Sequence, residues 1–122
     1  METIQNVLRR FGITRCYKGL PHTSYAIFLA VQDENCLTAI TRKIYLASAK
    51  HFHCKQAAIE RNIRTAVSRA WQINPELLRA VAGYPLDAAP TASEFIEIMA
   101  TYVQKQTGGQ IDFQEEHFGA GK

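Results

Sequence analysis

Positive charge gathers in one stretch of this chain. Between Arg42 and Arg69 the sequence holds seven basic residues and a single acid, Glu60, which gives this stretch a net charge of +6. The whole chain carries only +3, so the remainder is acidic. A concentrated basic surface is typical of proteins that bind the phosphate backbone of a nucleic acid. A solvated basic face without a partner is the alternative that charge alone leaves open. The basic residues are Arg42, Lys43, Lys50, Lys55, Arg61, Arg64 and Arg69.

Histidine and cysteine in the same stretch suggest two other kinds of chemistry. His51, His53 and Cys54 are zinc-ligand types, but a structural zinc site needs four ligands with paired spacing, and the other cysteines and histidines are isolated. A Cys54–His51 nucleophile pair is disfavoured because this segment is expected to face phosphates rather than a pocket. The chain also has no glycine-rich phosphate loop and no paired catalytic carboxylates. We therefore predict no metal, no cofactor and no enzymatic activity.

One long helix, predicted over residues 56–73, must position the basic residues. Its apolar residues recur with the 3.6-residue period of a helix, which predicts one buried stripe. Trp71 is the largest member of this stripe and is interpreted as a core anchor. The stripe consists of Ile59, Ile63, Ala66, Val67, Ala70 and Trp71, and the opposite face carries Ala57, Glu60, Arg61, Arg64 and Ser68.

A second, shorter helix is expected to end at Phe52, immediately before a turn over residues 53–55. A short helix, a turn of about three residues and a longer helix with a basic outer face form the helix-turn-helix pattern. The turn lacks the glycine that is frequent in this motif. A structural helical hairpin that binds no nucleic acid is the alternative reading.

The rest of the chain is also predicted to be mainly helical. Apolar periodicity and stop signals predict helices from Thr3 to Phe11, from Pro21 to Val31, around residues 37–45, and after Pro75. The segment Ile13 to Gly19 is expected to be a connector with Cys16 or Tyr17 turned inward. Thr91 and Glu94 have the spacing of a capping box at the start of the last helix. The predicted fold is an all-α compact bundle of about six or seven helices. We expect residues 1–109 to form this domain and residues 110–122 a flexible tail.

Length and composition agree with a small globular protein. A chain of 122 residues with 47% hydrophobic residues can build one core. No apolar run is long enough to span a membrane, and the N-terminus lacks the features of a signal peptide. Three scattered cysteines predict free thiols in a reducing compartment. A cytoplasmic location and no membrane partner are therefore expected.

Several short sequence motifs lie along the chain, from about Glu2 to Gln106. In this order and spacing they resemble the C-terminal DNA-binding effector domain of the stage 0 sporulation protein A response regulator. The resemblance implies an all-helical transcription regulator of sporulation whose long helix enters the major groove of a short TGTCGAA-like box, often in tandem copies. The motifs are Phe11-Gly12-Ile13, Lys18-Gly19, Ile40-Thr41-Arg42, Tyr45, Ala49-Lys50, Ile59-Glu60-Arg61, Ile63-Arg64, Ala70-Trp71, Gly83-Tyr84, Pro90-Thr91 and Ser93-Glu94-Phe95-Ile96.

The resemblance implies roles for individual side chains. Glu60, Arg61 and Arg64 match family residues that face the DNA bases. An arginine can reach O6 and N7 of guanine together, whereas Glu60 could accept from a cytosine amine or hold Arg61 in its rotamer. Lys55, at the helix N-terminus, is expected to meet a phosphate. The other residues expected to contact phosphates are Gln56, Ser68, Arg42 and Lys50.

The chain departs from the family pattern at three positions in the predicted helix-turn-helix. Ala58 stands where an arginine is common, Leu46 where a proline is common, and Lys55 where a threonine caps the long helix. These departures bear on the affinity and the target sequence more than on the fold. The family's receiver domain, with its phosphorylated aspartate, has no counterpart in this sequence, which is either a stand-alone paralogue or a fragment of a longer protein. Because nothing in these residues could receive the phosphate, regulation is expected to come from abundance, dimerisation or a partner.

The expected partner is double-stranded DNA, bound by a homodimer or by tandem copies, with the sigma subunit of RNA polymerase as a further candidate. The alternative function is a protein-interaction module that binds the full-length regulator or RNA polymerase without its own DNA site. DNA affinity that falls steeply with salt distinguishes the first function from the second.

Overall fold

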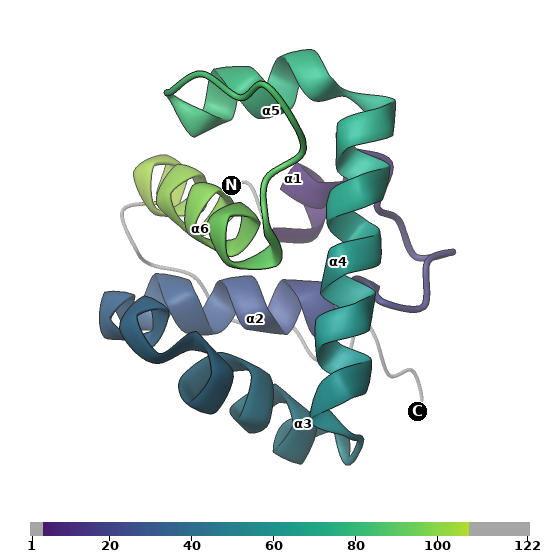
Figure 1. The fold of residues 1–122 in the computed structure, drawn as a ribbon, viewed down its shortest axis with the longest axis vertical. Helices are drawn as coiled ribbons and strands as arrows, with labels where there is room; N and C mark the ends of the chain where they lie inside the picture. Colours follow the sequence, from purple (N-terminus) through teal and green to yellow (C-terminus); the bar gives the residue numbers. More distant parts are fainter. Residues whose placement is uncertain (1–3, 108–122) are drawn as a thin grey trace.

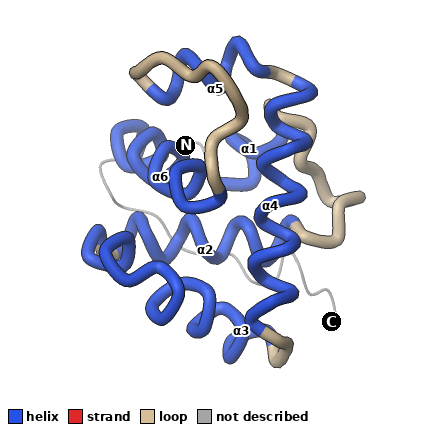
Figure 2. Tube along the Cα trace, in the orientation of Figure 1, coloured by secondary structure: helices blue, strands red, loops and turns tan. Residues whose placement is uncertain are grey.

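The computed structural model describes residues 4–107 of the chain. Within these residues it contains helices and no strand, which confirms the all-α prediction (Figures 1 and 2). The predicted boundary at residue 109 and the predicted tail over 110–122 lie outside the described residues. The elements are α1 (Ile4–Arg9), α2 (Leu20–Gln32), the 3₁₀-helix η1 (Glu34–Ala39), the π-helix η2 (Thr41–Leu46), α3 (Ala47–Phe52), α4 (Gln56–Ile73), α5 (Pro75–Ala82) and α6 (Ala92–Thr107).

Helix α2 lies at the centre of the bundle, with α3 and α6 beside it and α4 crossing one end (Figure 1). It begins beside Pro21, which suits the first turn because this turn has no internal partner for a backbone N–H. Its residues are apolar on nearly all sides, and Ala26, Ile27 and Ala30 are buried. Because α2 contacts most of the other elements, it fixes the direction in which α4 leaves the core.

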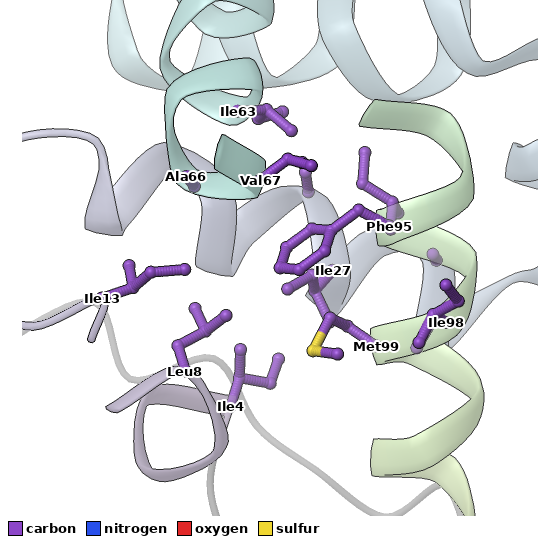
Figure 3. Close-up of a cluster of buried hydrophobic side chains, with 14 of the residues drawn as sticks. Ile4, Leu8, Ile13, Ile27, Ile63, Ala66, Val67, Phe95, Ile98 and Met99 are labelled. Carbon is purple, nitrogen blue, oxygen red and sulfur yellow. The ribbon is translucent and has the colours of Figure 1, made fainter. Parts of the chain in front are cut away.

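The core forms where α2, α4 and α6 meet, with α1 closing it from one side (Figure 3). Phe95 and Met99 of α6 lie against Ile27 of α2 and the inner face of α4, and both are fully buried. The α4 stripe is buried from Ile59 to Ala70, as its periodicity predicts. Burial of these side chains is the main force that holds α4 to the bundle.

Trp71 is an exception to the predicted stripe, because it is only half-buried and packs at the edge of the core. Twelve residues separate it from Ile59, so it lies about 120° around the helix axis from that residue. This rotation places Trp71 at the edge of the buried stripe. The Arg79 guanidinium of α5 lies 4.9 Å from the ring centroid and covers part of its face. The prediction that Trp71 is a buried core anchor was therefore wrong.

The segment before α3 also differs from the expected single helix. Ile44 and Tyr45 are buried as predicted, but the chain forms a 3₁₀-helix and then a π-helix that runs directly into α3. The Asp33 side chain accepts from the Asn35 amide at 3.0 Å, and the Thr38 hydroxyl donates to the Asn35 carbonyl at 2.7 Å. These local bonds stabilise the tighter turns of η1 at the expense of a regular α-helix.

The remaining helix ends follow the sequence signals. The Asn74 side chain accepts from the Leu77 amide at 3.2 Å and caps α5, which ends at the left-handed Gly83. Thr91 and Glu94 form both hydrogen bonds of the predicted capping box, at 3.1 and 2.9 Å. In the part of the chain that the structure describes, no helix is both long enough and apolar enough to cross a membrane.

Candidate nucleic-acid interface

Helices α3 and α4 form the predicted helix-turn-helix, joined by the three residues His53, Cys54 and Lys55 (Figure 1). His53 adopts the left-handed conformation, with φ 56° and ψ 48°, at the position where glycine usually ends a helix. The Cys54 amide donates to the Ala49 carbonyl at 3.0 Å and closes the end of α3. The motif thus forms without glycine because a histidine takes the left-handed position.

The outer face of α4 is open to solvent along most of its length. Ala57, Arg61, Arg64 and Ser68 are exposed, and Glu60 is half-buried at the edge of this face. These residues are spaced three or four apart, so they form one stripe opposite the buried one. The predicted base-contacting residues are therefore on one surface, which we call the α4 face.

Glu60 organises part of the α4 face. Its carboxylate lies 3.7 Å from Arg64 Nη1 and accepts a 3.3 Å hydrogen bond from Gln56 Nε2. The side chain of Arg64 is 64% exposed and that of Glu60 32% exposed, so the pair restrains the guanidinium without burying it. Glu60 therefore pairs with Arg64 and not with Arg61, and Arg61 has no ion-pair partner among the side chains that the structure describes.

Tyr45 of η2 lies beside the Glu60–Arg64 pair. Burial raises the pKa of the Tyr45 hydroxyl, the charge of Glu60 raises it further, and Arg64 acts in the opposite direction. This proximity places η2 along the Glu60 edge of the α4 face. One flank of the face is therefore formed by the segment that leads into α3.

The residues predicted to contact phosphates are mostly exposed. Arg42 lies on η2, Lys50 in the last turn of α3, Lys55 at the N-cap of α4 and Ser68 at the C-terminal end of the α4 face, and all four are open to solvent. Gln56 is half-buried and donates to Glu60, so its amide already has a protein partner. Lys55 is exposed at the N-terminus of α4, so its ammonium can reach an anion beside the turn.

Contacts among Tyr17, His22 and Asn62 hold one side of α4, and the sequence did not indicate any of these pairings. The Tyr17 hydroxyl donates to the Asn62 carbonyl, and Asn62 Nδ2 lies 2.7 Å from His22 Nδ1. Of the two residues predicted to turn inward in the connector, Tyr17 does so and Cys16 is exposed. These contacts join residues 40 to 45 positions apart, so no local pattern could have indicated them.

His22 also connects α4 to α3. Its ring centroid lies 4.8 Å from that of Phe52, the last residue of α3. Burial lowers the pKa of His22, which favours the neutral ring that can accept a hydrogen bond from the Asn62 amide. The His51 ring stacks on Tyr25 at 4.1 Å, whereas His53 is exposed at the turn. No group of three potential metal ligands gathers among the described residues.

The arrangement presents two guanidinium groups and a carboxylate on an exposed helix face, with ammonium groups at the adjoining turn. A guanidinium can bind guanine bidentately, and ammonium groups suit phosphates. A family model described as "Sporulation initiation factor Spo0A C terminal" matches residues 4–103 of this chain. The matched range includes the helix-turn-helix and all the residues of the α4 face.

Proposed function

Because this chain belongs to the family of Spo0A C-terminal domains, which are DNA-binding regulatory domains and not enzymes, we propose that it binds specific sites in double-stranded DNA and regulates transcription. Helix α4 would lie in the major groove, with Glu60, Arg61 and Arg64 toward the bases. The proposed activity acts on chromosomal DNA in the cytoplasm.

The α4 face is the observation that carries this proposal. An α-helix with its side chains is about as wide as the major groove of B-DNA, so an exposed helix face can reach the base edges. Arg61 has a free guanidinium on this face, and Arg64 is oriented by Glu60. In this proposal Arg61 selects a guanine, whereas Glu60 keeps Arg64 in a defined position for a second base or a phosphate.

The neighbouring cations would fix the position of the helix on the duplex. Lys50 and Lys55 lie on either side of the turn, and Arg42 lies on η2, which flanks the α4 face. Phosphate contacts of this kind hold a protein in register but carry no sequence information. Ser68 extends the same role further along α4, whereas Gln56 acts first on Glu60.

A comparison of two substitutions at Arg61 tests base reading against charge. Arg61→Ala is expected to weaken binding to a TGTCGAA-like box by about 1–3 kcal/mol and to change binding to a scrambled duplex little. Arg61→Lys keeps the charge but loses the bidentate geometry, so it should lose specificity and retain non-specific affinity. Titration of each variant against both duplexes, by fluorescence anisotropy, measures the difference. Equal losses on both duplexes would show that α4 follows only the backbone.

Protein partners form a finer part of the proposal that depends on the family relationship. Copies of the chain are proposed to bind neighbouring boxes in tandem, and the sigma subunit of RNA polymerase is the proposed contact of the DNA-bound protein. Gel shifts on duplexes with one and two boxes test the first idea. If the chain binds no duplex even at low salt, the transcription-factor proposal fails and a protein-interaction module becomes the better account.

A further inference from the structure

The connector between α1 and α2, residues 10–19, is the second basic element beside α4. It carries Arg15 and Lys18, which are both exposed, and the sequence from Ile4 to Gly19 contains no acidic residue. Cys16 is exposed between them, whereas Tyr17 turns inward. The connector also holds Arg10, whose guanidinium donates to the Tyr102 hydroxyl of α6 at 3.1 Å. Arg15 and Lys18 are its two other cations, and no acidic residue lies near them in the sequence.

The connector is fixed to α4 by side chains from both segments. The Tyr17 hydroxyl donates to the Asn62 carbonyl, and Arg69 Nε donates to the Gly12 carbonyl at 2.8 Å. Figure 1 shows the connector passing beside α4, on the side away from α6, before it enters α2. The position of the two cations relative to the α4 face is therefore set by the fold.

Two glycines allow this close approach. Gly12 has φ +78°, and a Cβ atom there would lie 2.9 Å from Ile73 Cγ1. A Cβ atom at Gly19 would lie 2.5 Å from the Tyr17 ring. Such distances are too short for a side-chain carbon, so a larger residue at Gly12 would press on Ile73 of α4 and one at Gly19 on the Tyr17 ring of the connector, and something must shift at either position.

The connector and η2 lie on opposite flanks of the α4 face. Asn62 is about 100° around the helix axis from Arg61 in one direction, and Glu60 is about 100° away in the other. The connector contacts Asn62 and Arg69, whereas η2 packs against α4 at the side where the charge of Glu60 raises the pKa of the Tyr45 hydroxyl. The proposed base-contacting residues are thus bordered by basic segments on both sides.

We propose that the connector is a second phosphate-binding element, in which Arg15 and Lys18 bind the DNA backbone on the flank opposite η2 and α3. This inference rests on the proposed function. A helix in the major groove has one sugar–phosphate strand on each side, so elements on both flanks of α4 can each meet a strand. The α3–α4 turn supplies cations for one strand, and the connector supplies them for the other.

A double substitution tests this inference by its effect on salt dependence. Arg15→Gln with Lys18→Gln should weaken binding to the box and to scrambled duplex alike, by about tenfold or more near 0.1 M salt. The slope of log K against log[salt] should become shallower by about 1.8 units, because two phosphate contacts are lost. The charge-retaining pair Arg15→Lys with Lys18→Arg should preserve the slope. Lys105→Gln, an exposed site on α6, controls for a change in net charge.

Affinity cleavage provides a measurement that does not depend on a substitution of the cations. An iron–EDTA reagent attached to Cys16 in a Cys54→Ser background should cut the backbone beside the box on the connector flank. The reverse arrangement, a label on Cys54 in a Cys16→Ser background, should cut near the α3–α4 turn instead.

The outcomes separate this inference from the function on which it rests. A parent protein that binds the box, while the Arg15/Lys18 double variant keeps the parent slope and the Cys16 label cuts nothing, would overturn the connector proposal alone. A parent protein that binds no DNA would overturn both. A shallower slope with cleavage on the connector flank would support the proposed contact.

Discussion

Replacing Lys55 with serine should stabilise the fold and weaken DNA binding at the same time. Lys55 is the N-cap of α4, with φ −82° and ψ 147°, and it makes no side-chain capping bond. A serine in this conformation can accept from a free amide of the first turn, which contributes about 0.5–2 kcal/mol. Removing a cation from the positive end of the helix dipole adds about 0.3–1 kcal/mol. We expect a net gain of about 1–2 kcal/mol in the free energy of unfolding.

The only loss expected for Lys55→Ser is in its affinity for DNA. Losing one phosphate contact makes the slope of log K against log[salt] shallower by about 0.9 units, for specific and scrambled duplexes alike. Thermal melts followed by circular dichroism and salt-series titrations measure the two effects separately.

Lys50→Ser is the matched control for both effects. It removes the same charge from the other side of the turn, but it lies in the last turn of α3, where serine cannot cap and a cation is favourable. Lys50→Ser should therefore leave the free energy of unfolding without a gain. Its slope of log K against log[salt] should become shallower by about as much as that of Lys55→Ser. If Lys55→Ser melts no higher than Lys50→Ser, the capping argument is refuted. An unchanged salt slope for Lys55→Ser would refute its contact with phosphate.

Four further predictions test the fold. Trp71→Ala should lower the free energy of unfolding by about 1–3 kcal/mol, because the indole is half-exposed. Phe95→Ala, at a fully buried site, should lower it by about 3–5 kcal/mol, and equal losses in urea melts would contradict the edge position of the indole. Thr91→Ala should cost about 0.5–2 kcal/mol through loss of the capping box without changing DNA affinity; an unchanged melt would mean that this bond contributes nothing in solution. His53→Gly should raise stability by about 0.5–1 kcal/mol, because glycine adopts the left-handed conformation without strain, and a lower melting temperature would argue against that strain. Burial lowers the pKa of His22 in the folded state, so the unfolded state takes up a proton first as pH falls below about 6.5, and the free energy of unfolding should decline there. His22→Gln should reduce this decline in urea melts at pH 5 to 8. An identical pH profile for the variant would assign the effect to other groups.

The sequence predicted the elements whose signals are local. The amphipathic period of α4, the Asn74-Pro75 break and the Thr91–Glu94 capping box each depend on residues within a few positions of one another. Such patterns predict an element regardless of the rest of the chain. The helix-turn-helix was predictable for the same reason, since it is a contiguous segment.

Features that depend on distant residues were missed or misjudged. The exposure of Trp71 depends on where α5 places Arg79, and the contacts of Tyr17 and His22 with Asn62 join separate helices. The partner of Glu60 was left undecided between a base and Arg61, because side-chain rotamers on one helix face are not specified by spacing alone. The 3₁₀ geometry of η1 is stabilised by local hydrogen bonds among Asp33, Asn35 and Thr38. The apolar spacing, which predicted a helix around residues 37–45, did not distinguish this geometry from an α-helix.

The contacts behind α4 have a thermodynamic consequence for recognition. Asn62, at the middle of the helix, is held by Tyr17 through its backbone and by His22 through its side chain, so this part of α4 is ordered before any ligand arrives. The entropy of ordering the helix is then lost during folding and not during association, which favours tight complexes. A preorganised helix also adapts little to an imperfect site. In the proposed function, discrimination between related sites then depends on how readily each DNA sequence deforms to meet the helix, in addition to the base contact proposed for Arg61.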